Sequence, residues 1–153
     1  MRNIKKILCA LDLTPHSAVV AEYAVTMSKA FDAQVVVMYA APALKQYAEF
    51  HVPPSHIENF VGEIVIGAEK AMEAFVAKHF QGTKAVGKVV NGYAPEEILK
   101  MAAAENANVI IMGTHGRKGI RRIIFGSVAE KIVKTSHIPV ITIRPAEKTV
   151  LSM

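Results

Sequence analysis

The sequence predicts an α/β fold, an open doubly wound five-stranded parallel sheet with helices on both faces. Two observations predict it. The chain contains short runs of aliphatic and β-branched residues, and it contains longer segments whose apolar residues recur every three to four positions. The two kinds of segment alternate along the chain. Such alternation is typical of parallel strands joined by helices, and right-handed crossovers then favour an open sheet that is covered on both sides.

Five segments have the composition of buried strands. Each is a short apolar run bounded by turn-forming or polar residues, the pattern expected of strands in a parallel sheet. The predicted strands are residues 4–11, 34–40, 84–90, 108–112 and 139–144.

Four segments between these strands have helical periodicity. Thr14 and Pro15 fit the N-cap and the first position of the first helix, and Glu96 and Glu97 suit the first turn of the third. Helices are predicted from Pro15 to Phe31, from Ser55 to about Phe80, from Pro95 onward, and from Ser127 to about Ser136.

Length and composition fit one domain with its own core. The chain has 153 residues, of which 52% are hydrophobic and 20% are charged, so it needs no disulfide or metal to fold. The single cysteine, Cys9, excludes an intramolecular disulfide and is interpreted as a buried small hydrophobic residue.

No segment has the pattern of a signal peptide or a membrane span, so we expect a cytoplasmic protein. Residues 1–145 are interpreted as the domain and 146–153 as a C-terminal tail.

Asp12 is the first candidate binding residue. It follows the first strand, and ligands of doubly wound sheets bind beyond the carboxyl ends of strands, where the strand order reverses. Its carboxylate could accept hydrogen bonds from a ribose or coordinate a divalent ion held by phosphates, and we favour the ribose. The alternative is that Asp12 only organises the turn before Pro15.

The second candidate is the glycine-rich, basic segment over residues 113–127. Its glycines let the main chain approach a ligand without obstruction by a Cβ atom. Gly126 and Ser127 open a helix, whose N-terminal amides attract phosphate. Much of the net charge of +5 gathers in this segment, on Arg117, Lys118, Arg121 and Arg122. The combination predicts a site for a phosphate-bearing anion.

The same segment resembles the universal stress protein family. Gly113, Gly116, Gly126 and Ser127 have the spacing G-x2-G-x9-G-S, which is similar to the ATP-binding branch, and the resemblance extends from about Lys5 to Arg144. It implies a parallel sheet of the adenine nucleotide alpha hydrolase-like, Rossmann-like type. It also implies ATP binding, with or without Mg²⁺, and a dimer.

The resemblance also implies roles for individual residues. Asp12 would hold the ribose, and Ala40 would meet the adenine through its backbone. The phosphates would be surrounded by Gly113, Gly116, Gly126, Ser127 and Val128. Arg117 is a further candidate for binding the phosphates because of the positive charge it brings to the loop. After Asp12 this chain has Leu13 and Thr14, where many relatives have Gly and Ser.

These observations favour an ATP-binding regulatory protein of the stress response. Hydrolysis is expected to be slow at most, because no general base is identified, so no catalytic residue and no protein metal site is assigned. The alternatives are a genuine ATPase or nucleotidyl-transfer enzyme, and a nucleic-acid binder using the basic loop over residues 117–122. That loop lacks the interleaved aromatic residues of a base-stacking surface, so nucleic acid is disfavoured.

The last predicted strand, Pro139–Arg144, has a second expected role. If it lies at the edge of the sheet, its open backbone groups can pair with a second copy of the chain. We therefore expect a homodimer through this strand. From the candidate site and the resemblance we expect an adenine nucleotide as the ligand, and we expect no membrane partner.

Overall fold

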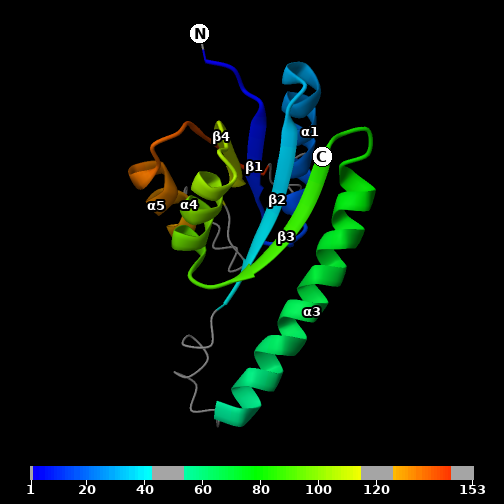
Figure 1. Ribbon diagram of the computed structural model, residues 1–153, viewed down its shortest axis with the longest axis vertical. Coiled ribbons are helices and arrows are strands. Elements are labelled where there is room, and N and C mark those ends of the chain that lie inside the picture. The colour runs from blue at the N-terminus through cyan, green and yellow to red at the C-terminus, as the bar shows by residue number, and fades with distance from the viewer. Residues whose placement is uncertain (1, 43–53, 115–125, 146–153) are drawn as a thin grey trace, which may run out of the picture.

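The computed structural model describes residues 2–42, 54–114 and 126–145, so the predicted tail over 146–153 lies outside the described residues. Within these ranges five strands form one parallel sheet in the order β3-β2-β1-β4-β5 (Figure 1). The prediction of an open five-stranded parallel sheet is therefore confirmed. The strands are β1 (Lys6–Ala10), β2 (Gln34–Ala41), β3 (Ala85–Asn91), β4 (Val109–Gly113) and β5 (Val140–Ile143).

The helices lie on both sides of the sheet, as a doubly wound fold requires. One hydrophobic cluster joins α1 and α3 to one face, and a second cluster joins α4 and α5 to the other (Figure 1). Their bounds are α1 (Ser17–Phe31), α3 (Pro54–His79), α4 (Ala94–Ala104) and α5 (Ser127–Thr135). No helix in the described parts of the chain combines the length and the apolar character needed to cross a bilayer.

The central strand β1 shows why the core has two halves. Successive side chains of a strand point to opposite faces. Ile7 and Cys9 therefore pack with α1 and α3, whereas Leu8 and Ala10 pack with α4 and α5. Cys9 is fully buried, which confirms its interpretation as a core residue, and this burial raises the pKa of its thiol to about 12. The run is apolar on both faces because both faces are covered.

The start of the first helix differs from the prediction. The helix α1 begins at Ser17 and not at Pro15, and Thr14 does not cap it. Instead, the Thr14 hydroxyl donates a 2.6 Å hydrogen bond to Asp12. An ionised acceptor nearby in the loop competes for the hydroxyl that would otherwise cap the helix, since charge-assisted hydrogen bonds are the stronger ones.

Candidate functional site

A cavity of about 230 Å³ opens at the carboxyl ends of β1, β2 and β4. The chain builds β2 and β3 on one side of β1, and then β4 and β5 on the other, so the strand order reverses at this point. That reversal leaves a crevice between the loops that follow the strands. Three helices also begin here, because Ser17 of α1, Ala94 of α4 and Ser127 of α5 all line the cavity.

Most of the predicted site residues meet at this cavity. They come from the ends of three strands and from the first turn of α5, segments far apart in the sequence. The lining includes Asp12, Ala40, Gly113, Gly126, Ser127 and Val128. Gly116 and Arg117 lie outside the described residues, as does the rest of the basic loop. The structure thus brings the described candidates together, and their roles in binding stay predictions.

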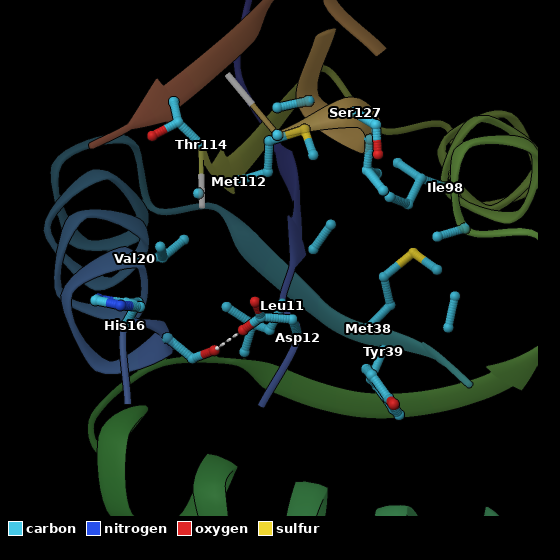
Figure 2. A pocket seen from close by; sticks show the side chains of 18 of the residues that line it. Leu11, Asp12, His16, Val20, Met38, Tyr39, Ile98, Met112, Thr114 and Ser127 are labelled. Carbon is cyan, nitrogen blue, oxygen red and sulfur yellow. Dashed lines mark hydrogen bonds between the residues drawn. The ribbon is translucent and has the colours of Figure 1, made fainter. Parts of the chain in front are cut away.

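Asp12 forms the polar end of the cavity next to α1. Its Oδ1 atom accepts three hydrogen bonds, from the Thr14 amide at 3.1 Å, the Thr14 hydroxyl at 2.6 Å and the Ser17 hydroxyl at 3.0 Å. Figure 2 shows the carboxylate at the cavity, with one of these bonds drawn as a dashed line. Asp12 therefore does organise the turn after β1, and it lines the cavity as well.

The turn after Asp12 contains a residue in a backbone conformation that favours glycine. Leu13 has a φ of 58°, in the left-handed region. Glycine adopts that conformation without steric cost, whereas an L-residue with a Cβ is strained by about 1–2 kcal/mol. The Leu13 side chain offsets part of this cost, because it packs against the hydrophobic cluster that joins α1 and α3 to the sheet.

The opposite end of the cavity is the junction of β4 with α5. The Gly126 amide donates a hydrogen bond to the Thr114 carbonyl, and the Thr114 amide donates one to the Ile143 carbonyl at 2.9 Å. These bonds hold the start of α5 beside the ends of β4 and β5. The first amides of a helix have no intrahelical acceptor, and they carry the positive end of the helix dipole. Ser127 and Val128 in this first turn line the cavity, which favours an anion there.

Between the two ends the floor of the cavity is apolar, and its residues are not among the candidates predicted from the sequence. Met38, Met112 and Ile98 line the cavity between Asp12 and Ser127 (Figure 2). The strand register pairs Ala10 with both methionines, so a small residue stands between two flexible ones. An apolar floor with a few polar groups at its rim suits a planar heterocycle. The one sequence feature that could have indicated this apolar floor is the small residue Ala10 near the end of the central strand.

Charge is sparse in the described lining. Asp12 is its sole carboxylate, and the described lining contains no lysine or arginine. Over residues 2–42, 54–114 and 126–145, no three His, Cys, Asp or Glu side chains gather closely enough to hold a metal ion. The described site therefore has one fixed negative charge at one end and helix amides at the other.

Comparisons with known proteins identify the family to which the sequence is similar. The sequence model described as the universal stress protein family matches residues 3–144. Universal stress protein MJ0531 of Methanocaldococcus jannaschii is 30% identical over 148 residues, which cover 94% of this chain and 84% of that protein.

Two solved structures extend the similarity to the fold. Protein MJ0577 of the same archaeon has a TM-score of 0.79 at 26% identity, covering 95% of this chain and 99% of that chain. The universal stress protein from Archaeoglobus fulgidus in complex with dAMP has a TM-score of 0.65 at 19% identity, covering 93% and 98%. At that identity the second similarity shows the fold alone.

Proposed function

The chain belongs to the universal stress protein family, and from this premise we propose that it binds an adenine nucleotide, ATP foremost, in the cavity at the ends of β1, β2 and β4. The single observation that carries the proposal is the arrangement of this cavity. Asp12 stands at one end, the first turn of α5 stands at the other, and an apolar floor joins them. The protein then acts as a cytoplasmic, nucleotide-dependent regulator in the stress response, because a ligand that binds one conformation better stabilises that conformation.

Each part of the nucleotide has a matching part of the cavity. The adenine ring lies on the apolar floor near Met38 and Ile98, where it meets the backbone of Ala40. The sugar lies towards Asp12. The phosphates lie at Gly113 and the start of α5, where amides and the Ser127 hydroxyl donate hydrogen bonds. The A. fulgidus relative, which was solved with dAMP, is consistent with an adenine nucleotide in this fold.

Mg²⁺ fits the site only as a companion of the phosphates. Asp12 is the one carboxylate in the described lining, and its Oδ1 already accepts hydrogen bonds from Thr14 and Ser17. Magnesium prefers octahedral oxygen ligands and usually takes several of them from water and phosphate. Asp12 would add one protein oxygen at most, which favours the sugar as its partner.

Hydrolysis by this site is expected to be slow. Phosphoryl transfer needs a group that positions the attacking water and charges that stabilise the transition state. The carboxylate of Asp12 is held in the turn at the sugar end, away from the start of α5, where the phosphates are placed. An ATPase or nucleotidyl-transfer activity is the alternative, and it predicts phosphate release well above background that is lost in Asp12→Ala.

The nucleotide proposal is tested directly on the purified protein. The chain is heat-denatured, and the supernatant is chromatographed for a co-purified adenine nucleotide. Protein freed of ligand is then titrated calorimetrically with ATP, ADP, AMP and GTP. We expect adenine nucleotides to bind in preference to GTP, and Ser127→Ala to weaken ATP more than AMP, because its hydroxyl lies at the phosphate end. A protein that binds none of the four nucleotides refutes the proposal.

We propose further that the chain forms a homodimer through β5. This strand is an edge of the sheet and pairs with β4 on one side only within the described residues. Its other side presents backbone groups to which a second copy can add a strand. The nucleic-acid alternative depends on the basic loop outside the described residues, and steeply salt-dependent binding to DNA or RNA would favour it.

A further inference from the structure

We propose that the open edge of β3 binds an extended segment of another protein, whose lysine or arginine side chain lies in the groove between β3 and α3. Main-chain pairing would supply the attachment, and the groove would select the basic residue. This surface shares no lining residue with the nucleotide cavity, so the inference does not depend on the proposed nucleotide function.

The backbone of β3 has one side free for pairing. This strand is an edge of the sheet and pairs only with β2 within the described residues. The Val35 amide donates a hydrogen bond to the Lys84 carbonyl, and the Gly92 amide donates one to the Ala41 carbonyl, both at 2.9 Å. Because backbone groups of successive residues point to alternate sides, the even-numbered residues of β3 bond to β2. The outward-facing groups belong to the odd-numbered residues Ala85, Gly87 and Val89. An added strand can pair with these groups.

A groove of about 330 Å³ lies beside this edge, where α3 packs along β3 (Figure 1). Its lining comes from one face of α3 and from the strand, and consists of Glu69, Met72, Glu73, Val76, Gly87 and Val89. Gly87 lies on the face of β3 that meets α3, since a Cβ there would touch Met72. Side chains of an added strand alternate between the two faces of the sheet. Every second side chain of the bound segment would therefore enter the groove.

The chemistry of the groove suits a long basic side chain. Met72, Val76 and Val89 supply apolar surface, and Glu69 and Glu73 supply two exposed carboxylates one helical turn apart. Neither carboxylate forms an ion pair with another described residue. Like charges at this spacing repel each other, and a cation between them relieves the repulsion. Lysine and arginine combine an apolar stem with a charged end, so they match both parts of the groove.

A second copy of this chain matches this edge less well. Two copies of β3 paired about a two-fold axis perpendicular to the sheet would bring their odd-numbered residues to the same face. Those residues carry no charge. Lys88 is the one basic residue of β3, and it lies on the opposite face, where it binds Glu105. The charge of the groove therefore favours a different protein as the partner.

The test uses a fluorescein-labelled, amidated peptide of sequence Thr-Val-Thr-Lys-Thr-Val-Thr, whose lysine and valines share one face of a strand. Fluorescence anisotropy measures its dissociation constant from the wild-type protein, and we expect saturable binding. A peptide with glutamate in place of the lysine should bind at least about tenfold more weakly, because like charges brought together at an interface oppose binding.

A charge reversal tests the groove itself. Glu69→Lys combined with Glu73→Lys should invert the order of the two peptides, so that the glutamate peptide binds more tightly than the lysine peptide. The control combines Glu22→Lys with Glu63→Lys, two exposed acids that do not line the groove. It has the same net charge and should retain the wild-type order. Circular dichroism establishes that both double variants are folded.

Hydrogen exchange followed by NMR tests the pairing of the backbone. The lysine peptide should slow the exchange of the outward-facing amides of Gly87 and Val89. It should leave the amides of Val86 and Lys88 unchanged, since these already bond to β2.

Four results overturn the inference. The wild-type protein does not bind the lysine peptide at millimolar concentration; the charge-reversed variant keeps the wild-type order of peptides; or the peptide does not slow exchange at Gly87 and Val89. In the fourth, these two amides become protected without peptide as the protein concentration rises, and the edge then binds a second copy of the chain.

Discussion

The Gly126 amide donates a hydrogen bond of 2.5 Å to the Thr114 carbonyl, which ties the first turn of α5 to the end of β4. Because Thr114 is 5% exposed and also bonds to Ile143, this tie is anchored in the core. It holds the N-terminus of α5 at the cavity. An anion site built from helix amides depends on such a fixed placement, since the attraction of the helix dipole fades beyond the first turn.

We predict that Gly126→Val abolishes ATP binding while the protein stays folded. Gly126 has a φ of −65° and a ψ of 155°, which any residue can adopt, so valine causes no backbone strain there. Its side chain would instead occupy the space assigned to phosphate. Calorimetry should show at least a tenfold loss of ATP affinity, an order of magnitude that one lost hydrogen bond to a charged group already gives.

The control for this variant is Gly62→Val on the exposed side of α3, where an added Cβ meets no atom within 4 Å. It should bind ATP like the wild-type protein. Unchanged ATP affinity in a folded Gly126→Val protein would mean that the phosphates do not bind next to this residue. The assignment of the β4–α5 junction as the phosphate site would then be wrong.

Gly87 in β3 should be intolerant of any side chain, because α3 crosses the strand closely there. A Cβ at Gly87 would lie 2.6 Å from Met72 Cγ and 3.2 Å from Val76 Cγ2. Met72 is 2% exposed, and the atom in the way is its inner Cγ, so the side chain would have to shift to admit the Cβ. We expect Gly87→Ala to lower the free energy of unfolding by about 1–3 kcal/mol, as overpacking does, measured by urea denaturation.

The matched substitution in the same helix–strand unit is Gly67→Ala. This glycine lies inside α3, and an added Cβ meets nothing within 4 Å. Alanine should therefore stabilise the protein by about 0.5–1 kcal/mol, because it favours the helix more than glycine does. If Gly87→Ala and Gly67→Ala changed the free energy of unfolding by the same amount, the contact with Met72 would not determine the effect at Gly87. The loss of glycine's backbone freedom would then explain both substitutions.

The Glu105 carboxylate should make the fold sensitive to acid. It follows the end of α4 and binds two lysines, Lys88 of β3 and Lys6 of β1, so it joins three elements. The hydrogen bond from Lys88, aided by Lys6, lowers the pKa of Glu105 from its usual 4.5. The ionised Glu105 carboxylate therefore stabilises the fold fully above pH 4.5, and this stabilisation is lost as the pH falls through the lowered pKa of the folded state.

Urea denaturation at several pH values checks this prediction. Between neutral pH and pH 4.5 the difference in stability between the wild-type protein and Glu105→Gln should be constant, and below that it should shrink. Glu130→Gln is the control, because the pKa of Glu130 is also lowered, by Lys134 on the same helix, but this pair is exposed. Exposed pairs contribute little. A difference for Glu105→Gln that does not vary with pH would contradict the assignment.

The sequence predicted the sheet and both polar ends of the cavity because each depends on local signals. Asp12 follows an apolar run, and Gly126 and Ser127 precede a helical pattern, so the topology of parallel strands places them at one edge. The apolar floor was not predictable in this way. Met38 and Met112 have the same spacing as core residues, and only the register across Ala10 shows that they border a cavity.

The start of α1 shows a second limit of local patterns. Thr14 followed by Pro15 is a good helix-start signal, yet the helix begins at Ser17. The carboxylate of Asp12 binds the Thr14 hydroxyl and amide, and this contact overrides the cap. Capping statistics consider the helix alone and do not include a charged acceptor that competes for the same hydroxyl.

The backbone of β5 determines which substitution can test the proposed dimer. The carbonyls of Pro139 and Ile143 accept hydrogen bonds from β4 and from the residue that follows it. Since backbone groups of successive strand residues point to alternate sides, those of Val140 and Thr142 point away from β4, towards the open edge. A second copy pairing at this edge would therefore use the Thr142 amide.

We predict that Thr142→Pro separates the dimer without unfolding the protomer. Proline lacks the amide hydrogen and is tolerated on an edge strand whose N–H faces outward, so the bonds to β4 remain. Sedimentation of the wild-type protein should show a dimer, and that of Thr142→Pro a monomer with an unchanged circular dichroism spectrum. Thr142→Val keeps the amide and should stay dimeric. A wild-type monomer, or a folded Thr142→Pro dimer of undiminished affinity, would place the interface elsewhere or exclude it.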